Sequence, residues 1–233
     1  MSPASEAMQV KYRAVYELLV EAYGEPQRRR YLPPVDQLVN TILSQQTTGA
    51  NRQRAFQALK DRFSSWQAVM NADVHEVREA IRPAGLANQK APRIQEALRF
   101  VMRERGELAL DFLAGWPVQQ GKAWLTEIKG VGPKTASIVL LFTFGLPAFP
   151  VDTHVYRVTR RLGLIGTKVT ADKAHDILEN IVEPAAYYAF HVNLIRHGRE
   201  ICRAREPQCQ VCVVQQWCDF FQRRGDLRLE TEK

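Results

Sequence analysis

Four cysteines have the most specific spacing of any residues in this chain. Cys202, Cys209, Cys212 and Cys218 follow the pattern C-x6-C-x2-C-x5-C and are the only cysteines among 233 residues. Thiolate sulfur binds zinc and iron–sulfur clusters, and coordination chemistry alone does not choose between them. Because all four lie in one short segment, the spacing favours one shared metal site in a reducing compartment over disulfides scattered through a secreted fold.

A glycine turn between two helical patterns is the second candidate for chemistry. Gly130 and Gly132 flank Val131, so the backbone can adopt positive φ while the valine packs between the adjoining helices. Pro133 suits a first helical turn, and apolar residues then recur at helical spacing until Gly145. Amide N–H groups at a helix start lack intrahelical partners and attract phosphate. The pattern predicts a helix-hairpin-helix, with a plain helix–helix connection as the alternative.

Composition sets the broad class of the chain. A net charge of +7 and a pI of about 9.4 favour a polyanionic partner, although many basic proteins bind none. With 45% hydrophobic residues, the chain can form one large domain or two small ones. No apolar run approaches the roughly 18 residues that cross a bilayer, and residues 1–10 show no signal-peptide pattern. We therefore expect a soluble protein that is not exported.

Apolar residues recur at helical spacing along nearly the whole chain, and no segment alternates convincingly with period two. The sequence therefore predicts an all-α fold. Besides the two hairpin helices, the predicted helices cover residues 11–23, 35–43, 51–63, 66–70, 74–81, a segment containing 94–101, one after Asp152 that ends at Gly163, one from Thr170 to 181, and a last one containing 190–197.

Two breaks between these helices could be either surface loops or functional loops. Ser44–Gly49 is a polar run at the end of the second predicted helix, and the two interpretations are about equally favoured there. Arg82–Asn88 leaves the apolar Leu86 at a loop tip, where packing into the core is the default expectation.

These motifs together resemble the endonuclease III family, the iron–sulfur members of the helix-hairpin-helix DNA glycosylase superfamily. Lys134 stands two residues after the second hairpin glycine, and Asp152 follows eighteen positions later in Val-Asp-Thr-His. The segment Ile42–Thr47 resembles the family's glutamine-bearing loop, and Ala84–Ala91 resembles its apolar wedge loop. With the cysteine pattern, the resemblance extends from Val35 to Cys218.

The resemblance implies a two-domain helix-hairpin-helix glycosylase fold with a DNA groove between the halves. Residues 34–145 would form a six-helix domain containing the hairpin, and residues 146–222 would hold the C-terminal helices and a 4Fe-4S cluster on the four cysteines. Residues 1–33 would pack with the cluster domain. Residues 223–233 are charged, lack an apolar face and are expected to be a disordered tail.

The resemblance also implies an activity, a bifunctional DNA N-glycosylase and AP lyase that removes oxidised or hydrated pyrimidines of the thymine glycol class. Lys134 would attack C1′ of the damaged nucleoside as a neutral amine and form a Schiff base, with strand cleavage by β-elimination. Asp152 would accept a proton or stabilise charge at C1′. Taken alone, Lys134 is favoured as a surface lysine or phosphate contact, and Asp152 as an N-cap; their spacing in the motif reverses that preference.

By the same resemblance, the partner would be double-stranded DNA with damaged pyrimidines or abasic sites. The protein would bind it as a monomer. Its location would be the cytoplasm, in association with the nucleoid if the source is prokaryotic. The flipped-out base would leave the stack, because its reacting atoms are unreachable inside a duplex. The DNA contacts would come from the two loops, the hairpin and the Val-Asp-Thr-His motif, namely Gln46, Leu86, Lys129, Gly130, Val131, Gly132 and His154.

Three positions depart from the family pattern and leave lesion preference open. Lys129 replaces the usual hairpin proline, Gly49 an acidic residue after the glutamine loop, and Ala87 an aromatic residue in the wedge loop. The alternatives are an adenine glycosylase of the same superfamily and a non-catalytic module that binds damaged DNA. The adenine enzyme uses a glutamate where this chain has Thr41, and it usually lacks the hairpin lysine.

Overall fold

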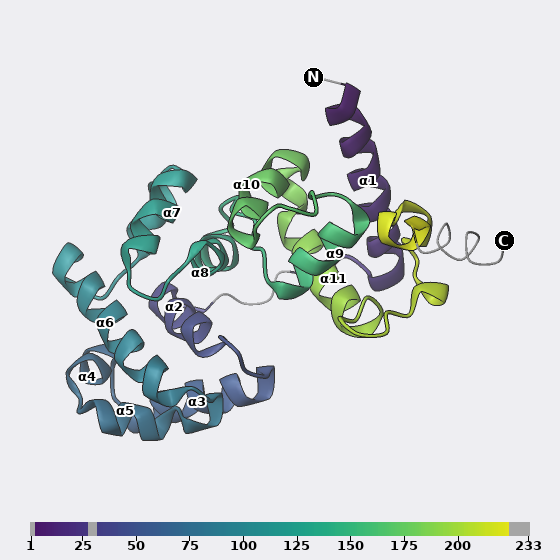
Figure 1. Cartoon of the computed structure of the whole chain (residues 1–233). Coiled ribbons are helices and arrows are strands. Elements are labelled where there is room, and N and C mark those ends of the chain that lie inside the picture. Colours follow the sequence, from purple (N-terminus) through teal and green to yellow (C-terminus); the bar gives the residue numbers. More distant parts are fainter. Residues whose placement is uncertain (1–2, 28–31, 224–233) are drawn as a thin grey trace. The chain divides into compact units, whose positions relative to one another are not determined.

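The computed structural model of the protein describes residues 3–27 and 32–223. The chain forms two compact units (Figure 1). The hairpin unit comprises residues 30–146, and the cysteine unit joins residues 1–29 to residues 147–233. No strand occurs in the described residues, so the all-α prediction is confirmed. Within the same residues, no helix has both the length and the apolar character that a membrane span needs.

The hairpin unit is built around its longest helix, α6. Ile94, Leu98 and Val101 lie on one face of α6 at helical spacing and are fully buried, and α6 packs against α2, α4 and α5. The α-helices of this unit are α2 (Pro34–Leu43), α3 (Gly49–Arg62), α4 (Trp66–Asn71), α5 (Val74–Ala80), α6 (Ala87–Arg105), α7 (Val118–Glu127) and α8 (Pro133–Val139). A short 3-10 helix, η1 (Arg82–Ala84), precedes α6, another, η2 (Asp111–Gly115), follows it, and a π-helical turn, η3 (Leu140–Phe144), extends α8.

Two side-chain caps fix where short helices begin. Ser65 Oγ accepts a hydrogen bond from the Ala68 N–H at 3.1 Å at the start of α4. Asp73 Oδ1 accepts one from the His75 N–H at 2.7 Å at the start of α5. Each bond satisfies an N–H group that has no intrahelical partner, which typically stabilises a helix by about 1 kcal/mol.

The cysteine unit centres on α11, which packs against both α1 and α9. Tyr12 of α1 meets Phe190 of α11 edge to face, with ring centroids 5.3 Å apart, and both side chains are buried. Lys11 of α1 forms an ion pair with Asp219 near the described C-terminal end. The helices of this unit are α1 (Pro3–Tyr23), α9 (Thr153–Leu162), α10 (Ala171–Ile181), η4 (Pro184–Ala186), α11 (Tyr187–Glu200), η5 (Cys209–Val211) and η6 (Gln215–Trp217).

The predicted start of the first helix differs clearly from the structure. Helix α1 begins at Pro3, earlier than the predicted Lys11, because apolar periodicity marks the packed part of a helix and Glu6 and Ala7 are exposed. Helix α11 continues through Gly198 to Glu200. A Cβ at Gly198 would lie 3.0 Å from the His154 Cβ, so this glycine permits the close approach of α9 and α11. Apart from Arg223, the predicted tail lies outside the described residues.

Candidate active site

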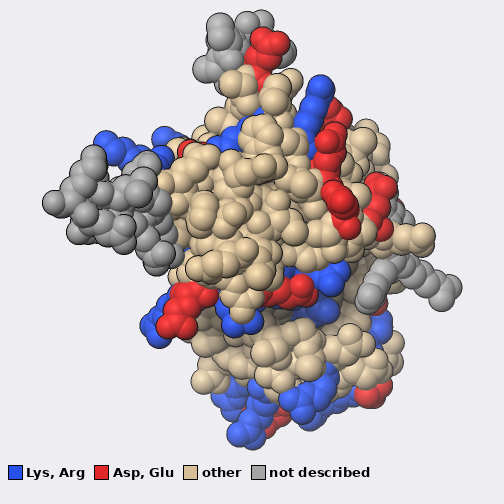
Figure 2. Space-filling model, turned by 90° about the vertical axis from the view of Figure 1, so that its right-hand side faces the viewer, with Lys and Arg blue, Asp and Glu red and all other residues tan. Residues whose placement is uncertain are grey.

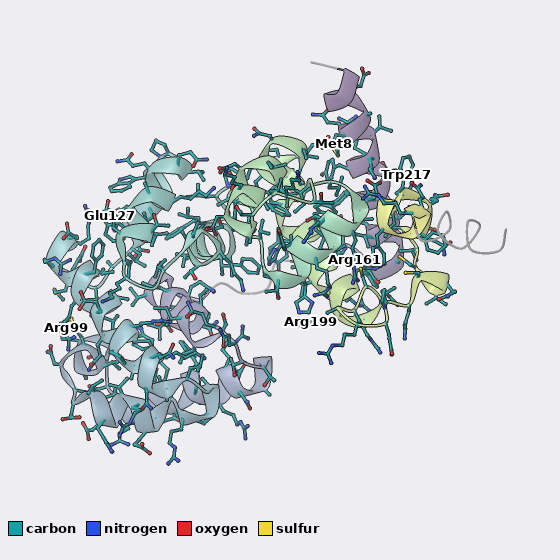
Figure 3. The ribbon with its side chains drawn as sticks, in the orientation of Figure 1. Met8, Arg99, Glu127, Arg161, Arg199 and Trp217 are labelled. Carbon is teal, nitrogen blue, oxygen red and sulfur yellow. The ribbon has the colours of Figure 1, made fainter. Side chains whose placement is uncertain are left out.

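The turn between α7 and α8 is a tight hairpin, as predicted. Helix α7 ends at Glu127 (Figure 3), and the Val131 N–H donates to the Ile128 carbonyl at 2.9 Å. Of the two glycines, only Gly130 needs its conformational freedom, because its φ is 88° whereas Gly132 is extended with φ −96° and ψ −178°. The Val131 side chain is buried, as the sequence indicated. The helix-hairpin-helix prediction is confirmed.

Gly130 is also constrained by a side chain that the sequence gave no reason to select. A Cβ at Gly130 would lie 3.0 Å from Cδ of Arg93, which comes from α6. The Arg93 guanidinium donates to Gln45 Oε1 at 3.4 Å, and Gln45 Nε2 donates to the Gly130 carbonyl at 3.3 Å. These contacts join the hairpin turn to the loop between α2 and α3. Because Arg93 is far from both partners in sequence, local pattern could not identify it.

Lys134 is the second residue of α8 and is partly exposed. It follows Pro133, and the preceding Gly132 provides no side-chain cap. The N–H groups of the first turn therefore have no intrahelical or side-chain acceptor. The long lysine side chain thus leaves the same helical turn that presents these N–H groups. Lys129, on the other side of the turn, is exposed.

Gln46 and Leu86 both lie at exposed loop tips of the hairpin unit. The Gln46 φ is 48° and the Leu86 φ is 51°, so both adopt the left-handed conformation that residues with a Cβ rarely occupy. Leu86 keeps 41% of its surface exposed. The default expectation that Leu86 packs into the core is therefore wrong, because the left-handed turn directs it away from the core residues of α6.

Asp152 caps α9 in the cysteine unit, as predicted. Its Oδ1 accepts hydrogen bonds from the N–H groups of His154 at 2.9 Å and Val155 at 2.8 Å. No bond to Oδ2 is found within residues 3–27 and 32–223, so the second carboxylate oxygen is left for another partner. Asp152 and Lys134 belong to different units of the structure.

His154 is held between α9 and α11. Its Nδ1 lies 3.1 Å from Nη2 of Arg157, and Arg157 also donates to the carbonyls of Gly198 at 2.7 Å and Cys202 at 3.0 Å. Burial lowers the pKa of His154, and the nearby Asp152 carboxylate opposes that shift. The neutral imidazole of His154 accepts a hydrogen bond from the Arg157 guanidinium. Because Arg157 also bonds the Cys202 carbonyl, it links the start of α9 to the first cysteine.

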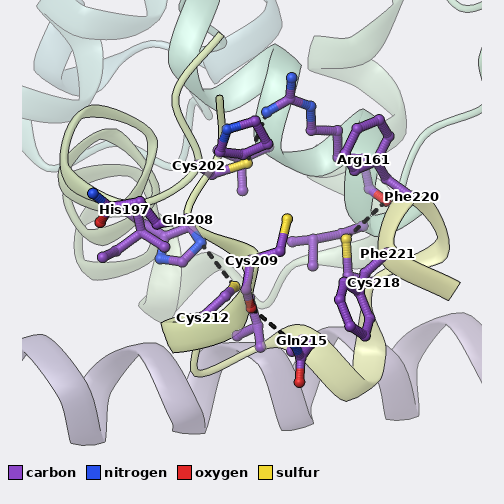
Figure 4. A pocket seen from close by; sticks show the side chains of 15 residues that line it. Arg161, His197, Cys202, Gln208, Cys209, Cys212, Gln215, Cys218, Phe220 and Phe221 are labelled. Carbon is purple, nitrogen blue, oxygen red and sulfur yellow. Dashed lines mark hydrogen bonds between the residues drawn. The ribbon is translucent and has the colours of Figure 1, made fainter. Parts of the chain in front are cut away.

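The four cysteines line one cavity of about 20 Å³ in the cysteine unit (Figure 4). All four are free thiols, as expected if they serve as ligands. Two neighbouring side chains reach their sulfur atoms. Arg161 of α9, labelled in Figure 3, donates to Cys202 Sγ at 3.3 Å, and His197 Nε2 lies 3.5 Å from Cys212 Sγ. Soft sulfur donors with cationic and imidazole N–H neighbours suit an anionic metal–thiolate centre.

Burial sets the protonation of these thiols. It raises the pKa of Cys212 to about 11 and also raises the pKa of Cys218. A metal centre would therefore have to displace protons from both groups. Among the described residues, no three His, Cys, Asp or Glu side chains are grouped so that they could hold one metal ion.

Comparison with known proteins places the chain in a family. A model of the HhH-GPD superfamily of base excision DNA repair proteins matches residues 39–184. Endonuclease III of Thermotoga maritima is 31% identical over 210 residues, which cover 89% of this chain and 94% of that protein. The chain belongs to the HhH-GPD superfamily. A protein of Arabidopsis thaliana named as a DNA glycosylase is 40% identical over 168 residues, 72% of this chain but only 57% of the plant protein.

The fold of this HhH-GPD protein matches that of a solved endonuclease III. The structure of a non-covalent endonuclease III–DNA complex superposes with a TM-score of 0.80 at 26% identity, covering 94% of this chain and 98% of that chain. The family resemblance predicted from the motifs is therefore confirmed. The protein is an endonuclease III-like DNA glycosylase of the HhH-GPD superfamily.

The departures of this glycosylase from the family pattern lie at element boundaries. Gly49 is the first residue of α3, directly after the cap Thr48, whose Oγ1 accepts from the Asn51 N–H at 3.2 Å. Ala87 is the first residue of α6. Lys129 is exposed in the turn between α7 and α8, so all three positions lie in or directly beside the loops.

Proposed function

We propose that this protein is a bifunctional DNA N-glycosylase and AP lyase that removes oxidised or hydrated pyrimidines from duplex DNA. The observation that carries the proposal is the position of Lys134, on the first turn of α8 and directly after the hairpin. A helix start attracts phosphate through its N–H groups. A primary amine that leaves the same turn can reach the sugar next to the bound phosphate. The membership of the chain in the HhH-GPD superfamily supports this assignment.

In the proposed reaction the neutral Lys134 amine attacks C1′ of the damaged nucleotide. The new N–C1′ bond replaces the glycosidic bond, the base leaves, and loss of the sugar ring oxygen from C1′ gives a Schiff base. β-Elimination then breaks the bond to the 3′ phosphate, and hydrolysis of the imine regenerates the lysine. Covalent catalysis in this form divides one difficult step into easier ones.

Asp152 would assist this attack while still capping α9. Its Oδ1 is used by the two N–H groups of the helix start, and Oδ2 is free among the described residues to accept a proton or to stabilise positive charge at C1′. The cap also fixes the side-chain rotamer. A carboxylate held in place loses less entropy when the substrate binds.

The DNA contacts of the proposed complex would come from both units. The backbone of Gly130, Val131 and Gly132 would bind the phosphate beside the lesion, with Lys129 adding positive charge. The exposed tips Gln46 and Leu86 would enter the opened base pair, because unstacking needs a group that fills the gap. His154 would lie near the strand beside Asp152. Lysine and arginine side chains also occur in several groups on the face seen in Figure 2, with acidic side chains among them.

We infer that Cys202, Cys209, Cys212 and Cys218 hold a 4Fe-4S cluster. A single zinc ion would draw four sulfurs to about 2.3 Å from one point, whereas a cubane uses one thiolate for each iron and needs a wider space. That all four thiols line one cavity supports a shared metal centre, and the similarity to endonuclease III favours the 4Fe-4S cluster over zinc. When bound, the cluster would supply the cross-link that folds the loop, and Arg161 and His197 would stabilise its thiolates.

The two units of the structure would then be the two domains that the resemblance implies, acting as a monomer. The hairpin unit would be the domain of residues 34–145, although it contains seven α-helices, α2 to α8, and not the six that the resemblance implies. The cysteine unit would be the cluster domain with its N-terminal helix. Lys134 comes from the first and Asp152 from the second.

Borohydride trapping tests the proposed function. A duplex with one thymine glycol is incubated with the protein, with and without borohydride, and the products are separated by size. We expect a covalent adduct with the wild type and also with Lys129→Gln, because Lys134 is still present in that variant. Lys129 is the matched control, since it is another exposed lysine of the same turn. Lys134→Gln should lose both the adduct and strand cleavage but keep most of its DNA affinity, since glutamine cannot form an imine. An adduct at the normal rate with Lys134→Gln would show that another amine is the nucleophile.

The same assay separates the alternative functions. Base release without an adduct or cleavage would indicate a simple glycosylase, and binding without any product would indicate a damage-binding module. The adenine glycosylase alternative has little support, because Thr41 is 3% exposed and its hydroxyl donates to the Gln37 carbonyl at 2.7 Å. A buried threonine hydroxyl cannot replace a catalytic glutamate as an acid. Release of adenine opposite oxidised guanine would contradict this argument.

A further inference from the structure

The two exposed loop tips share an unfavourable backbone conformation. Only three non-glycine residues in the described chain have positive φ, namely Gln46, Leu86 and Glu206. Gln46 belongs to the loop of residues 44–48, the glutamine loop, and Leu86 to the loop of residues 85–86, the wedge loop. Such conformations persist only where the surrounding structure holds them, and they often occur at functional sites. Some contact must therefore hold both loops.

One buried side chain bonds the bases of both loops. Lys90 of α6 is only 1% exposed, and its Nζ donates to the Leu43 carbonyl at 2.9 Å and to the Ala84 carbonyl at 2.8 Å. Leu43 is the last residue of α2, directly before the glutamine loop. Ala84 is the last residue of η1, directly before the wedge loop. The Lys90 backbone N–H also donates to the Leu86 carbonyl at 2.9 Å.

Burying an ammonium group is unfavourable unless it is hydrogen-bonded. Burial lowers the pKa of Lys90 for this reason. An apolar residue of similar length would fill the space without that cost. However, the carbonyls of Leu43 and Ala84 accept no backbone N–H group from the described residues, and a cation near a helix C-terminus is favourable. The presence of lysine at position 90 is therefore explained by its hydrogen bonds to the two carbonyls and not by the volume of its side chain.

We propose that Lys90 is a positioning residue of the glycosylase, which holds the glutamine loop and the wedge loop in the conformations that insert Gln46 and Leu86 into the opened base pair. This inference rests on the proposed function of the two tips. Lys90 itself is buried and acts only through the carbonyls of Leu43 and Ala84. It fixes the two tips together, because one ammonium group bonds the residues directly before both loops.

The same helix contains a matched control. Gln95 of α6 is 2% exposed, and its Nε2 donates to the Val69 carbonyl at 3.0 Å and to the Ala72 carbonyl at 2.8 Å. It is thus another buried side chain that donates to two carbonyls, but these carbonyls belong to α4 and its C-cap. Gln95→Met and Lys90→Met should both lose stability. Only Lys90→Met should release the two loops.

Hydrogen exchange of the free proteins tests the inference without DNA. We expect faster amide exchange in peptides that cover residues 44–48 and 84–88 of Lys90→Met, compared with the wild type. Gln95→Met should instead show faster exchange around residues 69–73. Exchange at the two tips that is unchanged in Lys90→Met, or that rises equally in both variants, would overturn the proposal.

The rates of base removal from duplex and from single-stranded DNA test whether Lys90 positions the two tips for insertion into the opened base pair. Misplacing an insertion loop by about 1 Å can cost on the order of 100-fold. We expect the duplex rate of Lys90→Met to fall on the order of 10- to 100-fold, with a smaller change on single-stranded DNA that needs no wedge. Gln95→Met should keep the wild-type ratio of the two rates. Equal ratios in both variants would contradict a positioning role.

A further variant covers the case in which Lys90→Met does not fold. Lys90→Gln keeps a donor, but its shorter side chain can bond only one of the two carbonyls, so one loop should exchange faster than the other. A wild-type protein that is inactive on both substrates would refute the proposed function but not the role of Lys90 in holding the two loops. The exchange experiment alone would then decide whether Lys90 holds the loops.

Discussion

Gly130→Ala is expected to destabilise the hairpin unit, whereas Gly132→Ala is not. Gly130 has a φ of 88°, and a Cβ there would lie 3.0 Å from Cδ of Arg93. Gly132 has a φ of −96°, and a Cβ there would meet no atom within 4 Å. The two glycines are in the same turn and differ in both backbone conformation and available space. They therefore form a matched pair.

The expected magnitude follows from two separate costs. A left-handed backbone costs an alanine about 1–2 kcal/mol. The contact with Arg93 adds about 1 kcal/mol, the lower end of the cost of overpacking. The sum for Gly130→Ala is roughly 2–3 kcal/mol, which corresponds to a decrease in Tm of about 4–12 °C for a chain of this size. Gly132→Ala should change Tm by less than about 2 °C.

Arg93→Ala separates the two costs. In the Arg93→Ala background only the backbone cost remains, so Gly130→Ala should lose about 1–2 kcal/mol instead of roughly 2–3. The assay is thermal unfolding, followed by circular dichroism and calorimetry, for the wild type, the three single variants and the Arg93→Ala/Gly130→Ala double variant. Equal decreases for Gly130→Ala and Gly132→Ala would refute the backbone assignment. A cost at Gly130 that is independent of Arg93 would refute the steric contact.

Three other predictions concern the proposed site. Asp152→Asn should keep the α9 cap and the Tm but slow base removal by about 100-fold or more, with a smaller effect on a preformed abasic site, whereas Asp152→Ala should also lose about 1 kcal/mol of stability. Similar losses of base removal and abasic cleavage in Asp152→Asn would contradict the assigned role. Leu86→Ala should hardly change stability, because the side chain is 41% exposed, but it should weaken binding to lesion duplex more than to single-stranded lesion. Equal losses on both DNAs would contradict the wedge. Cys209→Ser should lower the iron content and folded yield, and zinc in the wild type on metal analysis would refute the cluster.

Helix positions were predictable from sequence because local physics determines them. The caps at Ser65, Asp73 and Asp152 and the left-handed Gly163 that ends α9 are all local features. The start of α1 at Pro3 was missed because a helix can extend beyond its packed face. The cysteine pattern indicated a metal site because the ligands lie close together in sequence.

The residues that connect the loops were not predictable in the same way. Lys90 and Arg93 would be taken from sequence as surface residues of α6, since lysine and arginine are mostly exposed. Their partners Leu43, Ala84 and Gln45 lie in other elements, between 6 and 48 positions away. Only the tertiary fold brings them together. Left-handed φ at Gln46 and Leu86 is equally invisible in sequence, because neither residue type favours it.

The two hydrogen bonds from Lys90 explain how a DNA glycosylase could open a base pair at a low cost in free energy. Extruding a nucleotide costs a few kcal/mol of stacking and pairing, and loops that also had to be ordered on binding would add to that cost. Left-handed Gln46 and Leu86 are each unfavourable by about 1–2 kcal/mol. Hydrogen bonds from a charged donor contribute about 1.5–3 kcal/mol each, so the two bonds from Lys90 oppose the cost of both tips, although burial of the ammonium group removes part of that gain. The ordering cost of the loops is thus met during folding, and the binding energy of DNA remains for base extrusion.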